Sequence, residues 1–221
     1  MSRALKTPIV CYVTDRKSLG EGEAGEVVFG KIRAAAAAGV DWVQIREKDL
    51  CGRDLMALAR EAVAGGGSTR VIVNDRLDVA LAAGAAGVHL GRESLGARDV
   101  VRWCRGGHAP AEFLIGVSCH SLEDAREAES AGASYIFFGP VFDTPSKRGM
   151  GKPQGVERLG EICRSVAIPV VAIGGLNERN SGECTRAGAA GIAAIRMFQE
   201  ARDGGAMKAV IEGLHALDAS R

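Results

Sequence analysis

The chain has 221 residues, of which 47% are hydrophobic and 25% are charged, and its formal net charge is +1. Balanced charge without a cluster of Lys and Arg argues against a nucleic-acid or anionic-membrane surface. No long apolar segment and no signal peptide are evident, so we expect a cytoplasmic protein without a membrane span.

Short apolar runs alternate with longer Ala-rich helical patterns along the whole chain. Strands that are buried on both faces of a parallel sheet read as near-continuous apolar runs. The runs that fit are residues 9–14, 42–46, 70–73, 87–90, 113–117, 135–138, 169–173 and 191–195. Helical patterns between them include residues 25–38, 53–64, 122–131 and 156–165. This alternation predicts a parallel α/β fold, either a barrel or a doubly wound sheet.

A weak internal repeat favours the barrel. An Ala-Gly pair ends a helical pattern and leads into a strand at Gly39, Gly84, Gly132 and Gly188. Glycine suits a helix C-cap because it adopts left-handed backbone angles without a steric penalty. Because the unit recurs along the entire length, we predict one domain over residues 1–221, a (β/α)₈ TIM barrel.

Polar residues begin inside the second predicted strand. Alternate residues of a strand face the same way, so Gln44, Arg46 and Lys48 are expected to project together. Two cations and an amide suit a phosphate or diphosphate group, and barrel active sites lie where the strands end. The alternative is a solvated charged turn in which Glu47 and Asp49 are the partners.

The ends of the next strands also carry candidates. Asn74 precedes Asp75, which is either a metal ligand or the N-cap of the following helix, and both interpretations stay open. His89 is expected to be a hydrogen-bonded core residue. Ser118 and His120 are expected to face the barrel mouth, and His120 is the histidine best placed for acid–base chemistry.

The last three predicted strands lead into segments suited to phosphate. The loop over residues 139–155 is long, and such loops are usually functional. Paired glycines expose backbone N–H groups, and the loops after strands 7 and 8 form the usual phosphate site of barrels. The candidates here are Thr144, Ser146, Lys147, Gly174, Gly175, Ile195 and Arg196.

Together these segments resemble the thiamine phosphate synthase and thiazole tautomerase family over essentially the whole chain. No single motif is specific for this family, but the occurrence of all eight motifs in this order along the chain is. The motifs are Tyr12-Val-Thr-Asp-Arg16, Val43-Gln-Ile-Arg-Glu-Lys-Asp49, Asn74-Asp-Arg76, Gly87-Val-His-Leu-Gly91, Gly116-Val-Ser-Cys-His120, Gly139-Pro-Val-Phe142, Thr144-Pro-Ser-Lys147 and Ala172-Ile-Gly-Gly175.

The resemblance implies a reaction and a set of roles. A synthase of this family joins an aminopyrimidine methyl diphosphate to a thiazole phosphate and releases diphosphate, with Mg²⁺ as cofactor and Asp75 as one of its ligands. Small phosphorylated molecules would be its partners, and association into a homo-oligomer is left open. The implied pyrimidine diphosphate residues are Gln44, Arg46, Lys48, Asn74, Ser118 and Lys147. The implied thiazole phosphate residues are Thr144, Ser146, Gly174, Gly175, Ile195 and Arg196.

Three departures from the family pattern keep alternatives open, and the mildest is Ser146, which stands where a threonine is usual and keeps the hydroxyl. Ser94 stands where the second Mg²⁺-binding carboxylate is usual, and a hydroxyl is a poorer ligand for this ion. Arg196 stands where a small serine is usual. The Ser94 change favours the tautomerase, which needs no metal and would use His120 as its acid–base residue, whereas the Gln44, Arg46 and Lys48 set favours the synthase. A catalytically silent barrel that binds a phosphorylated metabolite is the third hypothesis.

Overall fold

The computed structural model describes residues 8–19, 24–144 and 153–217. Its eight strands are all parallel and form a closed barrel, in which each strand pairs with its neighbours in chain order and β8 pairs with β1. The strands are β1 Ile9–Val13, β2 Trp42–Ile45, β3 Arg70–Asn74, β4 Gly87–Leu90, β5 Leu114–Cys119, β6 Tyr135–Phe138, β7 Val170–Ile173 and β8 Gly191–Ala194. The predicted (β/α)₈ barrel is confirmed.

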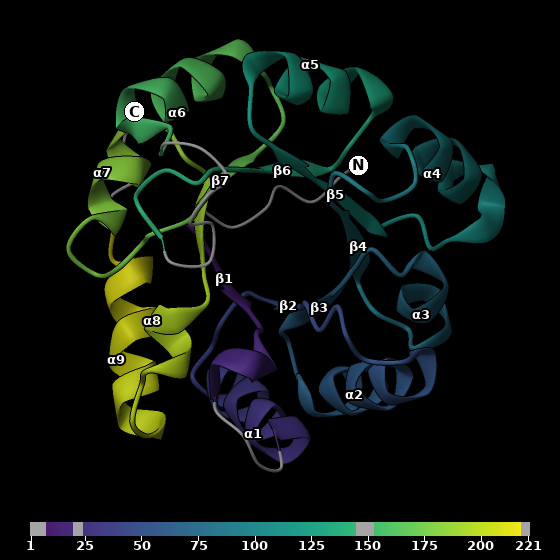
Figure 1. Ribbon diagram of the computed structural model, residues 1–221, viewed down its shortest axis with the longest axis vertical. Helices are drawn as coiled ribbons and strands as arrows, with labels where there is room; N and C mark the ends of the chain where they lie inside the picture. The colour runs from purple at the N-terminus through teal and green to yellow at the C-terminus, as the bar shows by residue number, and fades with distance from the viewer. Residues whose placement is uncertain (1–7, 20–23, 145–152, 218–221) are drawn as a thin grey trace.

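Helices surround the barrel on the outside (Figure 1). The four helices predicted in detail begin and end within one residue of their predicted limits. The helices are α1 Ala24–Ala37, α2 Gly52–Gly65, α3 Leu77–Ala82, α4 Ala97–Trp103, α5 Leu122–Ala131, α6 Gly155–Ser165, α7 Ser181–Arg186, α8 Arg196–Gln199 and α9 Gly204–His215, with short helical turns η1 Arg16–Leu19 and η2 Cys104–His108. None of them, within the described ranges, has the length and apolar character needed to cross a bilayer.

The repeated Ala-Gly turns have the backbone conformation that the sequence predicts. The φ angles are 88° at Gly39, 70° at Gly84, 89° at Gly132 and 103° at Gly188. A side chain at these positions would be strained, so glycine is required for the chain to leave the helix and enter the next strand.

Alternation along the strands separates two apolar layers. Residues such as Val43 and Ile45 face outward and pack against the helices. The inward residues fill the barrel, and Trp42 and Tyr135 pack with ring centroids 4.6 Å apart. The buried inward set is Ile9, Cys11, Val13, Trp42, Tyr135, Phe137, Val171 and Ala193. The barrel is therefore a packed core rather than a pore, and a ligand site has to lie at one of its ends.

Gly116 makes room for a polar connection between this core and the mouth. A Cβ atom there would lie 2.1 Å from Cζ of Tyr135 and 2.6 Å from Nδ1 of His89. His89 hydrogen-bonds the Tyr135 hydroxyl at 3.2 Å and the Ser118 hydroxyl at 2.9 Å. Burial lowers the pKa of His89 to about 3, so its ring is neutral near pH 7. The prediction that His89 is a hydrogen-bonded core residue is confirmed.

Candidate active site at the barrel mouth

Gln44 projects into the barrel at the end of β2. Its side chain is buried, and its Nε2 donates to Asn74 Oδ1 at 2.9 Å. Its Oε1 is buried too and accepts no hydrogen bond from a described residue. A buried acceptor without a donor costs free energy, about 1–3 kcal/mol in mutational series. A bound molecule with an N–H or O–H donor would remove that cost.

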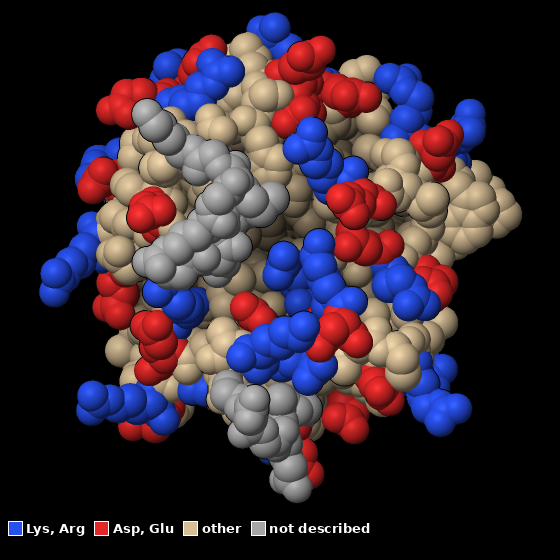
Figure 2. Space-filling view, in the orientation of Figure 1, with Lys and Arg blue, Asp and Glu red and all other residues tan. Residues whose placement is uncertain are grey.

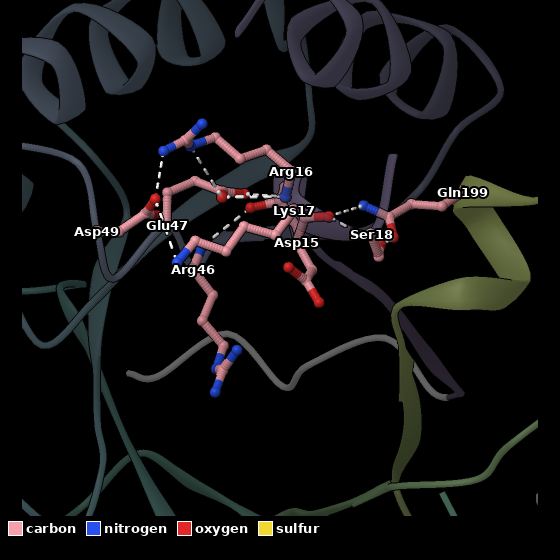
Figure 3. Close-up of polar contacts among 9 residues, drawn as sticks. Asp15, Arg16, Lys17, Ser18, Arg46, Glu47, Asp49 and Gln199 are labelled. Carbon is pink, nitrogen blue, oxygen red and sulfur yellow. Dashed lines mark hydrogen bonds and ion pairs between the residues drawn. The ribbon is translucent and has the colours of Figure 1, made fainter. Parts of the chain in front are cut away.

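Arg46 lies one inward position beyond Gln44, just past the end of β2. Its backbone N–H donates to the Thr14 hydroxyl at 3.0 Å, which ties the ends of β1 and β2 together. Its guanidinium extends away from the neighbouring charged contacts, as Figure 3 shows. Because β2 ends at Ile45, the strand alternation does not extend to Lys48, and that side chain lies exposed in the turn.

Glu47 faces the opposite way from Arg46 and is buried, with 2% of its side chain exposed. Its carboxylate accepts the backbone N–H of Arg16 at 3.0 and 3.2 Å and hydrogen-bonds the Thr14 hydroxyl. Burial raises the pKa of Glu47, and these hydrogen bonds oppose that shift. The interpretation of Glu47 as a solvated turn partner is wrong, because its carboxylate holds two loops together from inside.

The loop after β1 is joined to two other loops. The Arg16 guanidinium pairs with Asp49 of the β2 loop. Gln199 of α8 donates from Nε2 to the Asp15 carbonyl at 2.9 Å, and the Ser18 hydroxyl donates to Gln199 Oε1 at 2.6 Å (Figure 3). The segments after β1, β2 and β8 thus form one hydrogen-bonded unit at the mouth.

Asp75 organises the other side of the mouth, after β3 and β4. Its Oδ2 accepts from Asn74 Nδ2 at 2.6 Å, and its Oδ1 accepts from the Gly91 backbone N–H at 3.1 Å and from the Ser94 hydroxyl. Asp75 has a φ of 60°, unusual for a residue with a side chain. The N-cap interpretation of Asp75 is wrong, because α3 follows Arg76 and has no side-chain cap.

Ser118 lies in β5, and His120 comes directly after the last residue of this strand. Ser118 is joined to His89, as described above. The His120 ring Nδ1 hydrogen-bonds the Gly139 carbonyl, and its backbone N–H donates to Asp124 at 2.8 Å. A carbonyl can only accept, so Nδ1 carries the proton and, in the neutral ring, Nε2 is left as an acceptor.

The Gly174–Gly175 turn packs closely against the segment after β6. Both residues have positive φ, 98° and 69°. A Cβ atom would lie 2.6 Å from Pro140 Cα at Gly174 and 2.4 Å from the Asp143 carbonyl oxygen at Gly175. The two loops are also joined by the Phe142 N–H, which donates to the Gly174 carbonyl at 3.0 Å.

The remaining predicted residues lie around this turn. Thr144 is half-buried at the end of the described part of the loop. Ile195 packs on the inner core, and Arg196, the first residue of α8, is exposed. Ser146 and Lys147 lie outside the described residues.

Two contributors to the mouth were missed by the sequence analysis. Asp15 continues the inward alternation of Ile9, Cys11 and Val13, so the strand pattern could have found it. Gln199 contacts a loop 184 residues away and carries no local signal.

The charges on the surface are mixed. Lys and Arg side chains lie beside the central hollow of the face in Figure 2, with Asp and Glu side chains next to them. Two other hollows lie between α1 and α2 and between α3 and α4, and no predicted site residue lines either. The mouth is therefore the candidate site on chemistry and position, as expected for a barrel.

Comparison with known proteins shows the family of this chain. The family model described as thiamine monophosphate synthase matches residues 10–198. The chain belongs to the thiamine monophosphate synthase family. A putative thiamine-phosphate synthase of Geobacter sulfurreducens is 44% identical over 185 residues, which are 83% of each chain. The thiamine-phosphate synthase of a Roseiflexus species is 40% identical over 214 residues, 96% of this chain and 86% of its relative.

A solved structure supports membership of this family of synthases. The thiamine phosphate pyrophosphorylase from Pyrococcus furiosus has a TM-score of 0.80 and 32% sequence identity with this chain, and the match covers 95% of this chain and 94% of that structure. The similarity covers nearly the whole of both chains, so the two proteins share the barrel fold.

Proposed function

We propose that this chain is a thiamine-phosphate synthase. It couples 4-amino-2-methyl-5-(diphosphooxymethyl)pyrimidine with thiazole phosphate and releases thiamine phosphate and diphosphate. The observation that carries the proposal is the buried Gln44 Oε1, which lacks a donor and lies next to the inward Arg46 in a member of this family. An aminopyrimidine diphosphate has both the N–H donors and the anionic groups that this pair would bind.

The main task of the protein in this reaction is to neutralise the negative charge of the leaving diphosphate. No side chain has to form a covalent bond with the substrate. The methylene C–O bond breaks with its electron pair on the diphosphate, and the thiazole nitrogen then forms the new C–N bond. Arg46 and Lys48, together with Lys147 outside the described residues, are the cations that offset the growing negative charge. Asn74 and Ser118 complete the proposed set and orient the pyrimidine diphosphate.

Asp75 and Ser94 are the residues that would hold Mg²⁺. The oxygen atoms of these two side chains are chemically suitable ligands, because carboxylate and hydroxyl oxygens are hard ligands. Mg²⁺ is commonly held by one or two carboxylates together with phosphates of the substrate. No cluster of three or more His, Cys, Asp or Glu side chains suited to a metal is present in residues 8–19, 24–144 and 153–217. When bound, Mg²⁺ supplies positive charge to the leaving diphosphate. With a single carboxylate, Asp75, the protein holds the ion chiefly together with the substrate.

The Gly174–Gly175 turn is proposed to bind the thiazole phosphate. Glycine lets the backbone approach Pro140 and Asp143 closely, and exposed N–H groups at such turns suit phosphate oxygens. The other members of the proposed set are Thr144, Ser146, Ile195 and Arg196.

A second candidate reaction is the tautomerisation of thiazole carboxylate phosphate. Two observations favour it: Ser94 offers no second carboxylate, and the Gly139 carbonyl fixes the His120 tautomer so that Nε2 can accept a proton. This reaction shifts a proton and needs neither diphosphate nor metal.

One assay of the purified protein separates these functions. We expect thiamine phosphate and one equivalent of diphosphate from the two coupling substrates with Mg²⁺, and no isomerisation of thiazole carboxylate phosphate. No coupled product at high enzyme and Mg²⁺ would refute the proposal, and isomerisation that is lost in His120→Ala would establish the tautomerase. Binding of the substrates without either product would identify a silent barrel.

A further inference from the structure

Asp15 occupies an inward position at the mouth that none of the proposed roles uses. The register pairs Val13 with Gln44, and continuing it by two residues places Asp15 opposite Arg46. Ile9, Cys11 and Val13 face the barrel interior. The Thr14 N–H still donates to the Gln44 carbonyl at 2.9 Å, so the pairing of the two chains continues past the end of β1 towards Asp15. Figure 3 shows the Asp15 and Arg46 side chains extending in the same direction, away from the Arg16–Asp49 pair.

Two hydrogen bonds hold the backbone carbonyl of Asp15. Its carbonyl accepts the Ser18 backbone N–H at 3.1 Å and Gln199 Nε2 at 2.9 Å. Both contacts use the main chain of Asp15 and leave its carboxylate free to face the mouth.

The half-buried Asp15 carboxylate makes no hydrogen bond or ion pair with any residue in the described ranges. The Arg46 guanidinium points the same way and is not paired with it either. The Asp15 carboxylate and the Arg46 guanidinium thus lie at the same mouth without forming an ion pair. Such an arrangement suits a ligand that has an anionic group for Arg46 and a hydrogen-bond donor for Asp15. A carboxylate in direct contact with diphosphate would repel it, so we look for the partner of Asp15 in a donor group elsewhere on the ligand.

We propose that Asp15 accepts a hydrogen bond from the amino group of the pyrimidine substrate and stabilises the positive charge that develops on that group. This inference rests on the proposed function. When the methylene C–O bond breaks, its electron pair leaves with the diphosphate, and the cation is shared between the methylene carbon and the amino nitrogen. Asp15 stays ionised throughout and takes no proton, and the thiazole nitrogen supplies the electron pair of the new C–N bond. Hydrogen bonds to an ionised acceptor are roughly twice as strong as neutral ones.

Binding measurements with three probes test this role. The probes are the aminopyrimidine methyl diphosphate, the same compound without its amino group, and inorganic diphosphate, each titrated by calorimetry at one Mg²⁺ concentration. We expect Asp15→Asn to bind the amino compound about tenfold more weakly, the amino-free compound equally well, and inorganic diphosphate as well or more tightly. Asp15→Ala should give the same pattern, and Asp99→Asn, the same charge change on α4, should match the wild type.

The contrast between weaker binding of the amino compound and undiminished binding of inorganic diphosphate separates a contact with the substrate from a structural role. Equal weakening of all three probes would mean that Asp15 only supports the loop, and unchanged affinity for the amino compound would mean that it does not touch the substrate; either result overturns the inference. Asp15→Asn should also lower kcat of coupling, with retained thermal stability. If the wild-type protein forms no thiamine phosphate, the proposed function fails. If it forms the product and Asp15→Asn shows no selective loss, this inference alone fails.

Discussion

The two sides of the barrel mouth use their carboxylates in different ways. After β1 and β2, the buried Glu47 holds the loops from behind, and Arg46 and Asp15 remain available to a ligand. After β3 and β4, the Asp75 carboxylate supports the loop itself through Gly91 and Ser94 and is also the proposed metal ligand. On the first side, different residues support the loops and bind the ligand. On the second side, Asp75 does both. Substitutions on the first side can remove binding alone, whereas those on the second affect both.

The largest expected effect comes from Arg46→Ala. Removing this guanidinium takes away a positive charge that meets the leaving diphosphate, so we expect kcat/KM for the pyrimidine diphosphate to fall about a hundredfold. Its backbone contact to Thr14 remains, so stability should change little. Steady-state kinetics together with thermal unfolding test this. A variant with normal kinetics would show that Arg46 does not meet the diphosphate.

Gly116→Ala tests the hydrogen bonds of His89 with Tyr135 and Ser118, which lie below the barrel mouth. The new methyl group would overlap the Tyr135 ring and His89, so we expect a loss of about 1–3 kcal/mol in the free energy of unfolding. The His89–Ser118 contact would shift, and kcat would fall with it. Gly213→Ala in α9 is the matched control, because no atom lies within 4 Å of its added Cβ and alanine favours a helix by up to about 1 kcal/mol. Equal stability of both variants in urea titrations would contradict this packing.

Ser94→Asp tests the combined role of Asp75. A second carboxylate beside the first should lower the Mg²⁺ concentration needed for half-maximal rate about tenfold. Without Mg²⁺ the two like charges repel, so the variant should unfold at a lower temperature and regain stability when the ion is added. Ser94→Ala controls for loss of the hydroxyl. An unchanged Mg²⁺ requirement would mean that Asp75 and the substrate already suffice.

Glu47→Gln should have the smallest effect, visible in the pH dependence of stability. Burial raises the folded-state pKa of Glu47 above its unfolded value of about 4.3. The folded protein therefore binds this proton more tightly, and the resulting stabilisation is complete below about pH 4 and is lost as the pH rises through the folded pKa. The glutamine side chain does not titrate, so the stability of the variant does not decrease in this way as the pH rises. Urea titrations from pH 4 to 7 should show the wild type losing stability relative to the variant, and parallel curves would contradict the assignment. Glu61→Gln, on the exposed face of α2, is the control for the change of charge.

The strands and their inward faces were predictable because alternation is a local property. Gln44 and Arg46 project inward as predicted, since both lie within or directly beside β2. Lys48 does not follow the alternation, because the strand ends at Ile45. Strand limits depend on pairing between neighbours, and a single run of apolar residues does not contain that information.

Contacts between distant loops were not predictable. The Asp75–Ser94 contact joins the ends of β3 and β4, and Gln199 reaches Asp15 only because the barrel closes β8 onto β1. Glu47 looked like a surface residue in a charged turn, and its burial follows from the packing of two loops. Such features depend on tertiary geometry and leave no periodic pattern in the sequence.

The central claim is that residues from separate strands meet around one diphosphate-bearing molecule at this mouth. A crystal structure of the protein with the pyrimidine diphosphate, in the absence of thiazole phosphate, tests it most directly. We expect the diphosphate at Arg46 and a pyrimidine N–H at Gln44 Oε1. A ligand bound in the groove between α3 and α4, or one at the mouth that leaves Gln44 Oε1 without a donor, would contradict it.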